Sequence, residues 1–176
     1  MQTKKAIARL TLCAMMMALS ILIGAFCKAY LTIVPPAIRI TFENLPVILA
    51  AMLFGPIVGG AVGAGSDLIA SVISAQSSIN PMLMVGACMV GVSAGVIARI
   101  IPGELRPFKI TVSIFAGHII GSMLIKSIAL HVYFGVAWAM LIWRIPLYIG
   151  IAACESVLLG IILSNREIKK QIERLM

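Results

Sequence analysis

Ionisable side chains are rare in this chain of 176 residues, and Asp67 stands between two long uncharged runs, 44–66 and 68–98. An ionisable group at membrane depth costs about 2.5–3.5 kcal/mol on insertion scales, so it normally faces protein, water or a ligand. Asp67, Ser71 and Ser74 recur at i, i+4 and i+7, which places them on one face of a helix. We therefore expect this polar stripe to face inward, toward either a ligand or a cation of another helix.

Two further sets of polar residues recur at i, i+4 and i+11, a spacing that keeps side chains near one helical face: Ser122, Lys126 and Tyr133, and Arg144, Tyr148 and Glu155. Tyr133 belongs to its set only if the helix continues that far. Glu43 follows Arg39 by four residues, so these two can meet as an i,i+4 pair on one helical face.

The outer half of the molecule is expected to combine cations with carboxylates, namely Lys28, Arg39, Lys126 and Arg144 with Glu43, Asp67 and, deeper, Glu155. Arginine binds carboxylates through two parallel hydrogen bonds. A buried carboxylate can accept the paired amine and ring N–H of an aminopyrimidinone. Both groups together would suit a ligand with a heteroaromatic head and an acidic tail, a shape that folate has. The residues alone indicate a small polar ligand with an acidic part, taken from outside.

Enzyme chemistry finds little support in the sequence. Gly91-Val92-Ser93-Ala94-Gly95 fits the pattern G-x-S-x-G, but it lies within an apolar helical run, whereas that motif needs a strand-to-helix turn. We interpret it as a helix-packing face. The chain has no P-loop motif, so it cannot itself hydrolyse ATP that way, and it lacks an internal inverted repeat. We expect no enzymatic activity and no cofactor, and an energy source supplied by a partner.

Composition predicts an all-α integral membrane protein. The chain is 61% hydrophobic and 11% charged, with a mean hydropathy of +1.11, and a membrane-spanning helix needs roughly 20 residues. We expect a single domain, 1–176, with six transmembrane helices at roughly 10–27, 40–54, 57–75, 81–100, 108–131 and 140–164. The Gly55-Pro56 turn is so short that the second and third helices must be antiparallel neighbours.

The net charge of +8 is distributed as in a membrane protein rather than a nucleic-acid-binding one. Basic clusters precede the first span, follow the fourth and follow the last, which is the positive-inside pattern and places both termini in the cytoplasm. The connection 28–39 is expected to be ordered and partly extended, serving as a lid or merely as a connector. Ala14 and Ala18 let another helix approach closely, either one of this chain or one of a separate subunit.

Four short motifs support a family resemblance: Arg39-Ile40-Thr41-Phe42-x-Asn44-Leu45-Pro46, Leu53-Phe54-Gly55-Pro56, Gly63-Ala64-x-x-Asp67-Leu68 and Ala14-x-x-x-Ala18. With them the whole chain resembles the S components of energy-coupling factor (ECF) vitamin transporters, specifically the folate-specific group. The resemblance implies an S-component fold in the bacterial plasma membrane and high-affinity vitamin binding on the outer side. It also implies that span 1 docks, through Ala14 and Ala18, onto a transmembrane T component carrying two ATP-binding subunits. The S component would then topple in the lipid bilayer to release the vitamin inside.

The candidate substrate-binding residues are Arg39, Asp67, Ser71, Asn80, Lys126, Tyr133, Arg144 and Tyr148. A closely related hypothesis is an S component for a different vitamin, such as pantothenate, thiamine, riboflavin or a queuosine precursor. Three further hypotheses belong to different classes of protein: an autonomous secondary carrier or channel, a membrane enzyme, and a scaffold that transports nothing.

Overall fold

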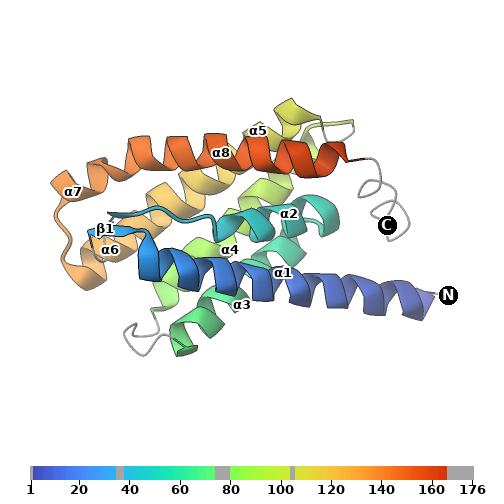
Figure 1. The fold of residues 1–176 in the computed structure, drawn as a ribbon, viewed down its shortest axis with the longest axis horizontal. Coiled ribbons are helices and arrows are strands. Elements are labelled where there is room, and N and C mark those ends of the chain that lie inside the picture. Colours follow the sequence, from blue (N-terminus) through green and yellow to red (C-terminus); the bar gives the residue numbers. More distant parts are fainter. Residues whose placement is uncertain (1, 35–37, 74–79, 104–105, 166–176) are drawn as a thin grey trace.

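The computed structural model describes residues 2–34, 38–73, 80–103 and 106–165. The elements run in the order α1 (Gln2–Tyr30), β1 (Thr32–Val34), β2 (Ile38–Arg39), α2 (Asn44–Phe54), α3 (Pro56–Ile73), α4 (Pro81–Ile100), α5 (Pro107–Gly117), the π-helix η1 (His118–Ile125), α6 (Lys126–Phe134), α7 (Trp138–Ile142) and α8 (Arg144–Ser164). The long helices run roughly along one axis, so that α1 begins and α8 ends at the same end of the bundle (Figure 1). We call the opposite end, which holds β1, α6 and α7, the hairpin end.

The helices have the length and composition of a membrane bundle. Among the described residues, five helical segments are long and apolar enough to cross a bilayer: Ala6–Tyr30, Pro56–Ile73, Pro81–Ile100, Pro107–Phe134 and Trp138–Ser164. The apolar helix Asn44–Phe54 is shorter. Large apolar side chains cover their outer surfaces, among them Leu10, Leu22, Ile57 and Ile161. The prediction of an all-α membrane fold with six helices is confirmed.

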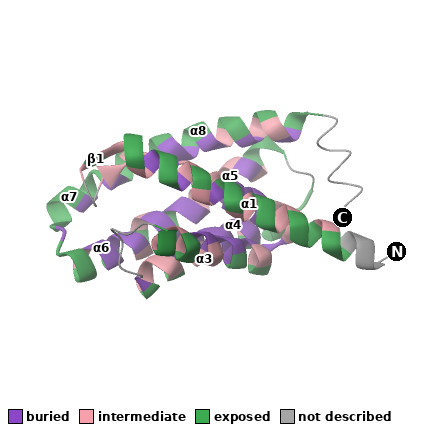
Figure 2. Ribbon diagram, turned by 60° about the horizontal axis from the view of Figure 1, so that its bottom comes forward, coloured by how far each residue is buried: buried purple, intermediate pink, exposed green. Residues whose placement is uncertain are grey.

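Helix α4 lies in the middle of the bundle, where Figure 2 shows buried residues along it and exposed residues on the outer sides of α1 and α8. A Cβ added at Gly91 would collide with the backbone of Gly59, so only glycine allows α3 and α4 to approach this closely. The hydroxyl of Ser93 donates to the carbonyl oxygen of Met89 within the same helix. The interpretation of the G-x-S-x-G pattern as a packing face is therefore confirmed.

The connection after α1 is a short antiparallel hairpin in which Thr32 of β1 pairs with Arg39 of β2. The expected partly extended connection is confirmed, although α1 continues to Tyr30 before it begins. The expected start of the second helix at residue 40 is wrong, because the hairpin keeps Arg39 extended and Ile40 donates its backbone N–H to Leu31. Helix α2 starts only at Asn44.

The turn between α2 and α3 needs glycine, because Gly55 has a φ of +101°. The two helices pack against each other on either side of this turn, as expected. Ser74, the third member of the polar stripe that begins at Asp67, lies outside the described residues.

The expected single helix over 108–131 is interrupted by the π-helix η1, which continues as α6 to Phe134. The prediction that Ser122, Lys126 and Tyr133 share one face is wrong in part: the first two are buried, whereas Tyr133 is 58% exposed. A π-helix bonds residue i to i+5 instead of i+4, so it shifts the helical phase of everything that follows. The last expected helix is likewise divided into α7 and α8, which meet at Trp143.

Candidate ligand-binding site

A small polar cavity lies toward the hairpin end, between α1, the residues before α2, α3 and α6. Its volume is about 20 Å³, close to the space that one water molecule needs. Its polar lining residues are Ser20, Lys28, Arg39, Glu43, Asn44, Ser66, Asp67 and Lys126. Three cations and two carboxylates therefore converge on one small space.

Glu43 connects two of these cations. Its Oε1 accepts a hydrogen bond from Arg39 Nη2 at 2.9 Å and lies 3.5 Å from Lys126 Nζ. Glu43 precedes α2, outside the helices that can span a membrane. Burial alone would raise the pKa of Glu43, but Arg39, Lys126 and Lys28 outweigh it and lower this pKa from 4.5 to about 2. The predicted contact of Arg39 with Glu43 is confirmed, but it forms between β2 and the residue that precedes α2 rather than along one helix.

The backbone of Glu43 is held on both sides. Ser20 of α1 donates its hydroxyl to the Glu43 carbonyl oxygen at 2.7 Å, and the Glu43 N–H donates to Thr41 Oγ1 at 3.3 Å. Gly24 gives the carboxylate its space, because a Cβ there would lie 2.8 Å from Glu43 Oε2. The wall formed by α1 is thus fitted to this one side chain.

A buried polar network extends from the cavity toward α8, with Ser122 of η1 at its centre. Asn44 Nδ2 donates to Ser122 Oγ at 3.3 Å. Arg144 Nη2 donates to the Ser122 carbonyl oxygen at 3.1 Å and to the Tyr148 hydroxyl at 3.2 Å. The guanidinium of Arg144 also lies 5.1 Å from the centre of the Tyr148 ring. This network connects the predicted residues Arg144 and Tyr148 to the cavity through Asn44.

His118 and Glu155 form a second buried pair, which adjoins this network at Tyr148. His118 Nε2 lies 2.7 Å from Glu155 Oε2, and the two side chains are 1% and 0% exposed. The His118 ring also contacts the Tyr148 ring, with 5.5 Å between their centres. The prediction that Arg144, Tyr148 and Glu155 lie near one helical face is confirmed, because all three are buried in the same helix.

The structure brings some of the predicted binding residues together and separates others. Arg39, Asp67 and Lys126 line the polar cavity. Asn80 caps α4 instead, because its Oδ1 accepts the N–H groups of Met82 and Leu83. Neither Asn80 nor Ser71 nor the exposed Tyr133 is among the lining residues.

Several residues that line the cavity are absent from the candidates chosen by sequence. Lys28 and Glu43 carried a signal, since both belong to the cation and carboxylate inventory of the expected outer half. Asn44 belongs to the first family motif but had no predicted role in the site, and Ser66 had no signal that distinguishes it from ordinary helix residues; both are buried. Their place in the site follows from the tertiary arrangement alone.

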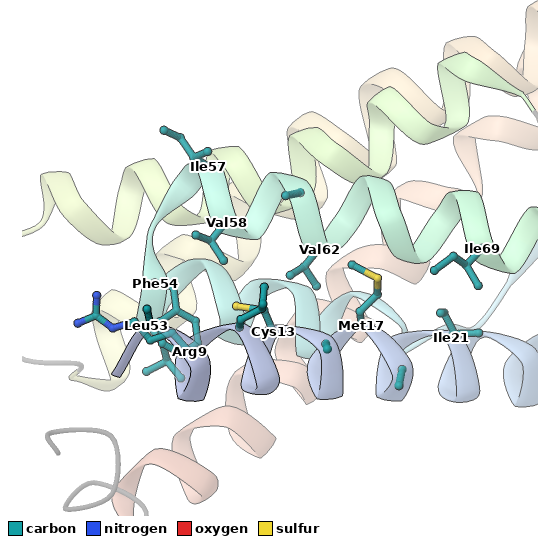
Figure 3. A pocket seen from close by; sticks show the side chains of 15 residues that line it. Arg9, Cys13, Met17, Ile21, Leu53, Phe54, Ile57, Val58, Val62 and Ile69 are labelled. Atoms are coloured by element: carbon teal, nitrogen blue, oxygen red, sulfur yellow. The ribbon is translucent and has the colours of Figure 1, made fainter. Parts of the chain in front are cut away.

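A large apolar groove runs between α1 and the adjacent helices α2 and α3, with a volume of about 1180 Å³. Figure 3 shows Cys13 and Met17 of α1 facing Val58 and Val62 of α3 across it, with Phe54 near one end. Ala14 and Ala18 line the groove on the α1 side, and both are exposed. The predicted docking residues therefore lie on an open, apolar face.

Comparison with known proteins gives two results. A family model described as "ECF transporter, substrate-specific component" matches residues 8–169. Over 67 residues the chain is 37% identical to a curated protein of Clostridium novyi (strain NT) named "Folate transporter FolT". The matched part covers 38% of this chain and 39% of that relative, so the similarity spans about two fifths of either protein.

Proposed function

The chain belongs to the family of substrate-specific components of ECF transporters, and from this premise we propose that it is the folate-binding subunit of such a transporter. The family consists of transporter components rather than enzymes, and this member is a multi-pass protein of the bacterial plasma membrane. Folate would be captured on the outer side of the membrane, at the hairpin end, with both termini of the chain in the cytoplasm.

The main support for folate as the ligand is the sequence similarity to the folate transporter of C. novyi. The polar cavity supports it, because Lys28, Arg39 and Lys126 outnumber the carboxylates of Glu43 and Asp67. Folate has two carboxylates in its tail, which suit a site with excess positive charge. Its aminopyrimidinone ring offers paired N–H donors, for which we assign Asp67 as the acceptor. The buried network through Asn44 and Ser122 joins this site to α8.

We assign the apolar groove beside α1 to the transmembrane T component, which would carry two ATP-binding subunits. Small residues allow close approach between helices in a membrane, and Ala14 and Ala18 line this groove. Once docked, the whole subunit would topple in the bilayer and release the vitamin inside. The uncharged, apolar outer surface of most helices is compatible with such a rotation.

Uptake of radiolabelled folate into proteoliposomes tests this assignment. The chain would be reconstituted alone and together with the T component and ATP-binding subunits of the same organism, with ATP inside or outside the vesicles. We expect uptake only with the complete assembly and only where the ATP-binding subunits reach ATP. Uptake by the chain alone would mean an autonomous carrier. ATP-driven uptake of another vitamin in preference to folate would keep the family role and overturn the proposed substrate.

A further inference from the structure

We propose that Glu43 is an internal competitor for the acidic part of the ligand: its carboxylate holds Arg39 and Lys126, and the ligand's carboxylate takes these two cations over. This inference rests on the proposed function only in requiring an acidic ligand. It assigns to Glu43 a role in specificity that its position beside the cavity does not by itself reveal.

Two cations from different elements meet at one carboxylate oxygen. Arg39 lies on β2 and Lys126 at the start of α6, and both approach Glu43 Oε1, at 2.9 Å and 3.5 Å. A carboxylate oxygen between a guanidinium and an ammonium is the arrangement that a bound acidic ligand would have. Glu43 therefore occupies the position that such a ligand needs.

The cavity, of about 20 Å³, has no room for the carboxylate of a ligand while the Glu43 side chain stays in place. The α1 wall is close, since a Cβ at Gly24 would lie 2.8 Å from Glu43 Oε2. An acidic ligand can reach Arg39 and Lys126 only if the Glu43 side chain gives up its place. The Glu43 backbone is bonded to Ser20 and Thr41, so the expected movement is a rotation of the side chain.

Glu43 also keeps its charge, because its pKa of about 2 leaves it negative throughout the physiological range. Protonation therefore cannot relieve the competition, and an acidic ligand must displace a charged group. Small anions that interact with Arg39 and Lys126 alone exchange one carboxylate for another and gain little. A ligand with a second, heteroaromatic part gains further contacts, so Glu43 would favour complete ligands over simple acids.

Calorimetric titration with para-aminobenzoyl-L-glutamate, which is the acidic part of folate without the pterin ring system, tests this role directly. The proteins are the wild type, Glu43→Gln and Asp67→Asn, each purified in detergent and checked by thermal unfolding. Asp67 lines the same cavity, so Asp67→Asn removes one negative charge without removing the group that bridges Arg39 and Lys126. The tail fragment lacks the ring that Asp67 is proposed to bind, so this variant reports the general effect of charge.

We expect Glu43→Gln to bind the tail fragment about tenfold more tightly than the wild type, and to gain clearly more than Asp67→Asn. Equal gains in the two variants would overturn the proposal, because they would reflect the overall charge of the cavity. Unchanged or weaker binding by Glu43→Gln would also overturn it and would make Glu43 a direct ligand contact or a structural residue.

A second variant, Glu43→Asp, keeps the test decisive if Glu43→Gln does not fold. It retains the charge but shortens the reach toward Arg39 and Lys126, so a smaller gain for the tail fragment is expected and no gain would contradict the proposal. Titration of the wild type with folate separates the two claims. Absence of folate binding together with a Glu43→Gln gain would refute the proposed vitamin and leave the competitor role in place.

Discussion

Arg39 is the residue whose removal should affect ligand binding most selectively. It lies at the cavity, and its contact with Glu43 indicates that it can hold a carboxylate. A hydrogen bond to a charged group contributes about 1.5–3 kcal/mol, so Arg39→Ala should weaken folate binding about 10- to 100-fold. A pterin without the glutamate tail should lose less. Calorimetry with both ligands measures this difference.

The matched control is Arg99→Ala, because Arg99 is exposed at the end of α4 beside the Gly55 turn, far from the cavity in the fold. It should leave both affinities unchanged. Equal losses for folate and for the tailless pterin in Arg39→Ala would show that Arg39 does not bind the tail.

The charge of Glu43 should give the protein a specific sensitivity to acid. Its pKa is lowered from 4.5 to about 2 in the folded protein, so its stabilising contribution is fully present above pH 4.5 and is lost as the pH falls toward 2. This contribution is about 3 kcal/mol at most. The melting temperature in detergent, followed from pH 7 to pH 3, should fall more steeply for the wild type than for Glu43→Gln. Parallel curves would contradict the low pKa.

At the scale of elements, the close crossing of α3 and α4 depends on glycines. A side chain at Gly91 would collide with the backbone of Gly59, so Gly91→Val should separate the two helices and lower the melting temperature or the folded yield. Overpacking of this kind typically costs about 1–3 kcal/mol. The control is Gly150→Val on α8, where a Cβ meets no atom within 4 Å among the described residues. Comparable losses in both variants would show that close approach is not the cause.

A substitution on helix α1 should abolish docking onto the partner without affecting folate binding. Ala14→Trp would fill part of the apolar groove, so we expect folate binding to persist while ATP-driven uptake is lost. Leu19→Trp is the matched control, because Leu19 is exposed on α1 but is not among the groove residues. Retained uptake in Ala14→Trp would place the docking face elsewhere. Binding titrations and proteoliposome uptake are both needed, since either alone leaves one role untested.

The elements also show where the sequence was informative. Long uncharged runs and the Gly55-Pro56 turn predicted the helices well, since burial in a membrane imposes both length and apolar composition. The sequence could not predict the π-helix η1, because its bonding shift has no compositional mark, and the expected face of Tyr133 was wrong for that reason. The pairing of Thr32 with Arg39 across the β-hairpin likewise has no compositional mark, so it could not be predicted from the sequence.

The candidate site was only partly predictable, for a related reason. Ionisable residues in apolar surroundings are conspicuous, so Arg39, Asp67 and Lys126 could be selected from the sequence, and all three line the cavity. Asn44 and Ser122, which are 78 residues apart in the sequence, connect that cavity to Arg144. Such a contact depends on how α2 and η1 pack, which periodicity does not reveal.

At the scale of the whole molecule, the polar cavity and the apolar groove differ in size and in polarity. The polar cavity toward the hairpin end gathers cations and carboxylates from several elements, whereas the groove beside α1 is large, open and apolar. This separation suits a subunit that holds a vitamin at one place and a membrane partner at another. If these assignments are correct, each function should be removable by mutation while the other remains.

Calorimetric titration of the detergent-purified protein shows whether this chain binds folate by itself. Folic acid would be compared with thiamine, riboflavin and pantothenate on the same folded preparation. We predict tight, saturable binding of folic acid at one site and no comparable binding of the other three. Preference for another vitamin, or no binding of folic acid by a demonstrably folded sample, would contradict it.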